Sequence, residues 1–170
     1  MRLASAFVVL SSLFLVNAAA TGTCVPHPGD KHVKVFVSGT WDAEPVAAGS
    51  SIVPGFRSDL ALSFKPVKDD IFLIQTVDGS LAISGSSGDL KLQKTNAGDE
   101  QQHYKITCNH CDIDGNDANN RACRIQPASN TNNCITNHGM KKHVDITACT
   151  TEKKSGQFWH FTESGWWNGE

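Results

Sequence analysis

Four polar side chains lie close together near the C-terminal end of the sequence, at Asn137, His138, His143 and Asp145. Amide, imidazole and carboxylate groups donate and accept hydrogen bonds, so such a set can hold a ligand rich in hydroxyl groups. The simpler alternative is a turn at Asn137-His138-Gly139, because Asn tolerates a positive φ and Gly follows it. Rings that could stack on a ligand belong to Trp41, Trp166 and Trp167.

A second cluster combines cysteines with histidines. It has the ligand types of a zinc site, at Cys108, Cys111, Cys123, His103 and His110. A redox-active Cys-x-x-Cys would need a thioredoxin-like βαβ context, which this sequence lacks. The segment Asp112–Asp117 is similar to the start of a calcium loop, but Asp117 stands where that loop needs Gly and Cys123 where it needs Glu. We therefore expect no metal here, only a polar turn held by its cysteines.

Familiar catalytic motifs are missing. The sequence has no Gly-x-Ser-x-Gly elbow, no His-Glu-x-x-His motif and no P-loop. Paired carboxylates for glycoside hydrolysis meet only in the folded protein, so the sequence leaves that alternative open. The prediction is a non-catalytic protein that needs no cofactor.

Length and charge bound the remaining classes. The chain has 170 residues, with 15 Lys and Arg against 17 Asp and Glu, and a net charge of −2. Binding to nucleic acid needs an excess of clustered cations, so we do not expect that partner. With 39% hydrophobic and 19% charged residues, the chain is too apolar and too weakly charged to be disordered.

The first 20 residues have the features of a secretory signal peptide. Arg2 is followed by an apolar run to Val16 and then by small residues through Ala20, where we expect cleavage. The run is shorter than the span of about 20 apolar residues that a membrane helix needs, and no later stretch could cross a bilayer. Residues 21–170 are therefore predicted to form one secreted, extracellular domain without membrane insertion.

Export decides how the cysteines are interpreted. An even number of cysteines in an oxidising compartment predicts three disulfides, formed by Cys24, Cys108, Cys111, Cys123, Cys134 and Cys149. The sequence alone does not choose among the possible pairings. Cys24 is expected to tie the N-terminal segment to the body of the domain.

Short alternating runs, separated by turns rich in Gly, Asn and Asp, predict β-strands and no helix in the mature chain. An all-β sandwich or barrel follows from strands at this spacing. The expected strands cover residues 32–37, 60–64, 71–75, 81–83, 90–93, 104–106, 124–126, 134–136, 143–146 and 158–161.

Two segments repeat the same order of elements. Residues 71–108 and 124–162 each contain two strands joined by a turn, then a glycine turn, an alternating segment, a polar loop and a final strand. A weaker echo runs from Leu60-Ala61-Leu62 to Asp70-Ile71-Phe72. Repeats of about 40–50 residues indicate a pseudo-symmetric array. Three units of four strands would close into a barrel with three hairpins capping one end, which removes free strand edges.

The ends of the repeats carry a family resemblance. Gln157-Phe158-Trp159, and less purely Gln102-His103-Tyr104, resemble the Gln-x-Trp element of ricin-B-type β-trefoil lectins. Cys134-Ile135 with Val144–Cys149 is similar to that family's Cys-Leu…Val-x-Leu-x-x-Cys element, which implies a Cys134–Cys149 disulfide. The resemblance implies a disulfide-stapled β-trefoil barrel of three pseudo-repeats. Structural roles are then expected for Gln102, Tyr104, Gln157 and Trp159.

The sequence departs from this family where the family binds sugar. Thr136 and Gly156 stand in the third repeat at the places of the family's Asp and Asn, and Ile83 and Gln101 stand there in the middle repeat. The usual pocket therefore lacks its carboxylate in both repeats. We expect glycan binding through loops instead, using Asn137, His138, His143 and Asp145.

The alternative is a secreted protein-interaction module on the same fold, such as a protease inhibitor or a host-directed effector. Its expected contact loop is the long, proline-marked stretch of residues 40–56. An extracellular protein would then be the partner in place of a glycan.

Overall fold

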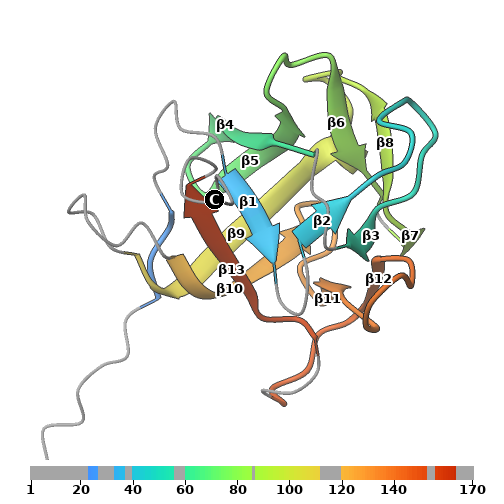
Figure 1. Cartoon of the computed structure of the whole chain (residues 1–170). Helices are drawn as coiled ribbons and strands as arrows, with labels where there is room; N and C mark the ends of the chain where they lie inside the picture. Colours follow the sequence, from blue (N-terminus) through green and yellow to red (C-terminus); the bar gives the residue numbers. More distant parts are fainter. Residues whose placement is uncertain are drawn as a thin grey trace, which may run out of the picture.

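The structure is a computed structural model of the chain (Figure 1). It describes residues 23–26, 33–36, 40–55, 60–85, 87–111, 120–152 and 156–163. The predicted signal peptide, the Asp112–Asp117 turn and the Trp166-Trp167 pair lie outside these ranges.

The regular secondary structure of the described residues consists almost entirely of β-strands, as the alternating runs predict. One short 3-10 helix, η1 (Glu100–Gln102), interrupts them, and it is not a span that could cross a bilayer. The strands are β1 Val33–Phe36, β2 Thr40–Asp42, β3 Val53–Gly55, β4 Leu62–Lys68, β5 Ile71–Thr76, β6 Leu81–Ser84, β7 Gly88–Asp89, β8 Lys91–Lys94, β9 His103–His110, β10 Asn120–Pro127, β11 Asn133–Thr136, β12 Asp145–Ala148 and β13 Trp159–Glu163.

Six of these strands close on themselves as an antiparallel barrel. Strand β1 pairs with β13, β13 with β10, β10 with β9, β9 with β5, and β5 with β4. The register pair Val33–Leu62 joins β4 back to β1 and completes the ring. Because every barrel strand has two neighbours, the wall has no free edge along which another chain could pair.

Three two-stranded units cap one end of this barrel: β2–β3, β6–β8 and β11–β12 (Figure 1). A cyclic set of backbone hydrogen bonds joins the three units. The amide of Ile52 donates to Leu90, that of Leu90 to Val144, and that of Val144 to Ile52, at 2.9, 2.8 and 2.8 Å. All three side chains are fully buried, so this ring closes the cap over the core. The expected barrel with three capping hairpins is confirmed.

The boundary between the first and second repeats differs from the one that the weaker sequence similarity at residues 60–72 implies. The structure places Ile71 and Phe72 in β5, the strand that opens the second repeat, whereas β4 closes the first. The echo at Asp70-Ile71-Phe72 is therefore wrong as a final strand. The reason is that apolar alternation looks the same in the first and last strand of a repeat, since both line the barrel.

Large aromatic side chains fill the barrel. The ring of Trp41 meets that of Trp159 edge to face at 4.9 Å, and Phe64 meets Phe161 in the same way at 4.9 Å. Such T-shaped pairs add to the hydrophobic free energy because the positive edge of one ring faces the negative face of the other. The expected structural role of Trp159 is confirmed, and its indole Nε1 donates to the Ile135 carbonyl at 3.0 Å.

The two glutamines of the repeat motif make equivalent contacts. The amide nitrogen of Gln102 donates to the Lys94 carbonyl at 2.9 Å, while its oxygen accepts from the Asn96 amide at 2.9 Å. Gln157 donates to the Ala148 carbonyl at 2.9 Å and accepts from the Thr150 amide at 2.8 Å. Each glutamine thus ties the loop before the last strand of its repeat to the end of the capping hairpin.

All six cysteines form disulfides, and the pair implied by the resemblance, Cys134–Cys149, is confirmed. The other bridges are Cys108–Cys123, between the adjacent strands β9 and β10, and Cys24–Cys111. Cys24 also exchanges two backbone hydrogen bonds of 2.8 Å with Cys108, so the N-terminal segment is tied to the barrel as expected. These cysteines have no thiolate left for zinc. Three disulfides indicate that the protein folds in an oxidising compartment.

The buried phenol of Tyr104, the single tyrosine of the chain, gives a direct optical test of the fold. Its burial, and next the charge of Asp99, raise the pKa of this hydroxyl far above its ordinary value. The unfolded chain loses the phenol proton near pH 10, whereas the folded chain keeps it. Stability contributed by this group is therefore constant below about pH 10 and falls as the pH rises further.

We expect the tyrosinate absorbance of the native protein to appear only together with loss of the near-ultraviolet circular dichroism signal. In concentrated guanidinium chloride the same residue should titrate smoothly near pH 10. A smooth titration of native protein near this pH, with the circular dichroism unchanged, would mean that Tyr104 is exposed.

Replacement of Gln157 tests the role of the repeat glutamine. Gln157→Met keeps the side-chain volume but leaves the Ala148 carbonyl and the Thr150 amide without this partner. We expect the free energy of unfolding in urea to fall by about 1–3 kcal/mol, the usual cost of unsatisfied buried polar groups. The exposed Gln93→Met is the matched control and should stay within about 0.5 kcal/mol of the parent. Equal losses for both variants would contradict a structural role for Gln157.

Candidate ligand-binding site

An open polar cleft of about 480 Å³ lies on the capping hairpin of the middle repeat. Two carboxamides, a carboxylate, an ammonium group, two hydroxyls and a glycine line it, and among the residues that the structure describes no apolar side chain does. The lining residues are Ser84, Gly85, Ser87, Asp89, Lys91, Gln93 and Gln101.

Strand alternation explains why this cleft is polar. Leu90 and Leu92 are fully buried and anchor the segment in the core. Successive side chains in extended backbone point to opposite faces, so Asp89, Lys91 and Gln93 must all face outward. The same pattern that fills the core therefore places three functional groups in one row.

The backbone of two cleft residues, Gly85 and Gln101, is held by Tyr104. Its hydroxyl lies 3.1 Å from the carbonyl oxygens of both Gly85 and Gln101. The Gly85 amide also donates to the Gln101 carbonyl at 3.0 Å. Because this backbone is held at three points, the Gln101 side chain is presented from a fixed base and can meet a ligand at little entropic cost.

A row of two histidines and two aspartates, here called the His–Asp row, continues from the cleft onto the third repeat. Asp145 of β12 stands opposite Asp89 of β7 in the strand register. His143 Nδ1 donates to Asp89 Oδ2, and His138 Nε2 donates to Asp145 Oδ1, both at 2.8 Å. Carboxylates directly opposite each other are unfavourable in a sheet, and each imidazole offsets one of them. Asp89 belongs to the row and to the cleft, so the two form one polar surface.

Three of the four residues expected to bind ligand belong to this row: His138, His143 and Asp145. Their side chains are 44%, 54% and 27% exposed, so a ligand can reach them. Asn137 is different, because it is buried and its side-chain oxygen accepts from the Gly139 amide at 2.7 Å. Its amide supports the turn that presents His138.

The third repeat has no room for the pocket of the resembling family. Thr136 is buried, and its hydroxyl accepts a hydrogen bond from Gln157 at 3.1 Å. Gly156 has a φ of +73°, and a Cβ at this position would collide with the carbonyl oxygen of Asn137. No side chain fits where the family has its Asn. The departures seen in the sequence thus have a physical cause in this repeat.

In the middle repeat the outcome is mixed. Ile83 is fully buried in the core, so it offers nothing to a ligand, while Gln101 lines the cleft. Sequence reasoning missed Asp89, Lys91 and Gln93 as site residues. The signal that could have found them is their alternation with Leu90 and Leu92, because the polar members of such a run face solvent.

Trp41 is not available as a stacking ring. It is 1% exposed and packs against Trp159, so the suggestion that it stacks on a ligand is wrong. Trp41 lies on β2, in the capping unit of the first repeat, and its ring is part of the core. In the described part of the chain, no aromatic side chain lines the cleft.

Residues 40–55 of the suspected contact loop form the β2–β3 hairpin, and residue 56 lies outside the described ranges. The loop between its strands is fastened to β8, since the Gly49 amide donates to the Leu92 carbonyl at 2.7 Å and the Leu92 amide to Ser50 at 2.8 Å. Val46 at its tip is 44% exposed. The loop therefore stands beside the cleft.

Among the residues that the structure describes, no three His, Cys, Asp or Glu side chains are grouped to hold a metal ion. His103 lies on β9 with its Nε2 2.9 Å from the Ala97 carbonyl oxygen. The side chain of His110 is outside the described set.

No family model and no curated protein sequence matches this chain. Solved structures do. A designed three-fold symmetric protein, ThreeFoil, matches with a TM-score of 0.57 and 9% identity over 78% of this chain and 98% of that chain. A chain of the cytolethal distending toxin from Actinobacillus actinomycetemcomitans matches with a TM-score of 0.55 and 13% identity, covering 79% of this chain and 92% of that one. Cry35Ab1 gives a TM-score of 0.60 at 12% identity over 79% of this chain, which spans 36% of that protein. The likeness is one of fold, and it agrees with the β-trefoil barrel.

Proposed function

We propose that this chain is a secreted, non-catalytic binding protein that binds carbohydrate in the cleft of the middle repeat and along the adjoining His–Asp row. The observation that carries the proposal is the composition of the cleft, which combines Asp89, Gln93 and Gln101 with serine hydroxyls and an ammonium group. Drug-like and lipid ligands prefer largely apolar pockets. A cleft without apolar side chains suits a ligand whose surface is mostly hydroxyl groups.

The donor and acceptor set supports this ligand class. A carboxylate accepts from two neighbouring hydroxyls of a sugar ring, and a carboxamide donates to one and accepts from another. Asp89 is 46% exposed and its Oδ2 is bonded to His143, which leaves Oδ1 for a ligand. Gln93 and Gln101, which both line the cleft, supply both functions.

Two observations support the extracellular setting of the proposal. The first 20 residues predict a signal peptide, and the three disulfides indicate an oxidising compartment. Without an aromatic platform in the described cleft, a single sugar would bind weakly, and several contacts on one glycan would add to the affinity.

A second candidate function is binding to an extracellular protein, such as a protease. Val46 favours it, because this exposed apolar side chain stands on the fastened β2–β3 loop. Exposed apolar groups on rigid loops are common at protein interfaces.

A glycan array probed with residues 21–170 separates the two candidates. We expect binding to one group of saccharides, weakened about tenfold or more in Asp89→Ala and His143→Ala, since each removes a hydrogen bond to a charged group. Asp70→Ala is the matched control, because the Asp70 side chain is also partly exposed and is paired to Lys105 at 2.7 Å, but does not line the cleft. It should bind like the parent.

Silence of the folded protein on the array, together with inhibition of a protease, would instead support the second function. Binding that Asp70→Ala and Asp89→Ala weaken equally would place the glycan elsewhere on the surface.

A further inference from the structure

We propose that the preferred saccharide carries an acidic group, a carboxylate or a sulfate, and that Lys91 binds this group. The inference rests on the proposed carbohydrate function and names the ligand class of that same cleft. It follows from which charged groups of the site already have a bonded partner and which one does not.

The carboxylates of the site each have a partner, whereas its ammonium group has none. Asp89 is bonded to His143 and Asp145 to His138, both at 2.8 Å. Lys91 is exposed, lines the cleft, and makes no ion pair with any residue that the structure describes. Among the described residues, Lys91 is therefore the charged group of the cleft that has no ion-pair partner, and an anionic group on the ligand would supply one.

The spacing of three side chains in the cleft fits one acidic sugar. Asp89, Lys91 and Gln93 alternate with buried leucines, so neighbouring side chains of this set are about 6–7 Å apart along the chain. This is roughly the width of a sugar ring. A ligand can thus place its acidic group on Lys91 while its hydroxyls meet Asp89 on one side and Gln93 on the other.

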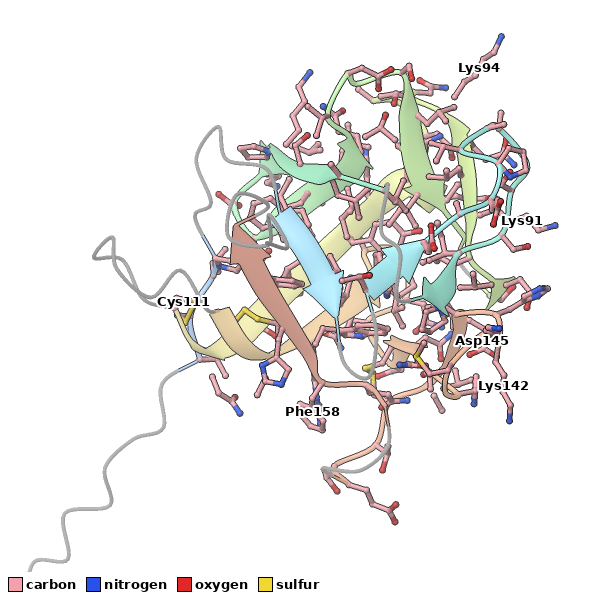
Figure 2. The ribbon with its side chains drawn as sticks, viewed as in Figure 1. Lys91, Lys94, Cys111, Lys142, Asp145 and Phe158 are labelled. Atoms are coloured by element: carbon pink, nitrogen blue, oxygen red, sulfur yellow. A yellow bond between two sulfur atoms is a disulfide. The ribbon has the colours of Figure 1, made fainter. Side chains whose placement is uncertain are left out.

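Two further cations stand on the same side of the molecule. Lys141 and Lys142 are exposed and directly precede His143, and their loop is held by the bond from the Lys141 amide to the Pro54 carbonyl at 3.0 Å. Figure 2 shows Lys91, Asp145 and Lys142 along one side of the molecule. The whole chain has a net charge of −2 and would repel anions, so any preference for them must come from this local surface.

The test compares lactose with two acidic derivatives, by array and by titration calorimetry. Sulfated lactose differs from lactose only in the sulfate group, whereas sialyllactose carries an additional sialic acid residue with its carboxylate. We expect the parent protein to bind at least one acidic derivative about tenfold more tightly than lactose, the size of one charge-assisted hydrogen bond. Added sodium chloride should reduce this ratio, because salt screens exposed charges. The sulfated and sialylated arms show which acid is preferred.

Substitutions locate the preference. The ratio of the affinity for the acidic derivative to the affinity for lactose should fall to about one in Lys91→Gln. It should be kept in Lys91→Arg. Lys94→Gln is the matched control, because Lys94 is an exposed lysine of the same strand that does not line the cleft, and its side chain lies apart from that of Lys91 (Figure 2). Its ratio should equal that of the parent.

Equal affinity for lactose and both derivatives, with glycan binding intact, would overturn this inference and leave the proposed function standing. Loss of the ratio in Lys94→Gln but not in Lys91→Gln would also overturn it. A folded protein that binds no glycan on the array would overturn the proposed function itself.

Discussion

The ring of three hydrogen bonds between Ile52, Leu90 and Val144 is the constraint on which the rest of the structure depends. These residues lie far apart in the sequence, one in each repeat, and each both donates to one partner and accepts from the other. A buried amide that lost its bond would pay the full cost of desolvation, so no repeat can shift without breaking the contacts of the other two. This ring closes the barrel mouth, and it fixes the positions of the loops on either side of it. The cleft exists because Leu90 is held in the ring and Leu92 is buried beside it, which turns the residues between and around them outward.

The residues of the repeat motif, by which the trefoil was recognised in the sequence, all make structural contacts within the fold. Gln102 and Gln157 bind backbone, Tyr104 supports the floor of the cleft, and Trp159 is buried against Trp41. None of them is free to bind a ligand, so the surface chemistry must come from other side chains, on the capping strands and the loops. At Gly156 the backbone itself comes too close to Asn137 to admit a side chain. Packing in the third repeat therefore leaves no room for a pocket at this position, while the middle repeat carries an open and polar cleft.

Much of the architecture was predictable because its signals are local. The Asp78-Gly79 turn is an example: the Asp78 carboxylate accepts from the hydroxyls of Thr76 and Ser80 and from the Ser80 amide, at 2.5, 2.8 and 3.1 Å, and these bonds lower the pKa of Asp78. Strand alternation, glycine turns and the repeat motif carry similar local information, and they gave the barrel, its caps and the Cys134–Cys149 bridge. The phase of the first repeat was wrong because its last strand and the next strand have the same apolar pattern.

The sequence by itself determined a disulfide-bonded β-trefoil, and it led to the predictions of export and of a ligand site at polar residues near the third repeat, since composition, spacing and turn chemistry act over short distances along the chain. Only the tertiary structure decided which of those polar groups are exposed and which partners they meet. Asn137 is part of a turn, and Trp41 is part of the core. Asp89 was brought to His143, 54 residues further along the chain, because the β7–β12 pairing joins the second repeat to the third. Contacts of this kind depend on how the repeats pack around the common axis, and no local pattern encodes them.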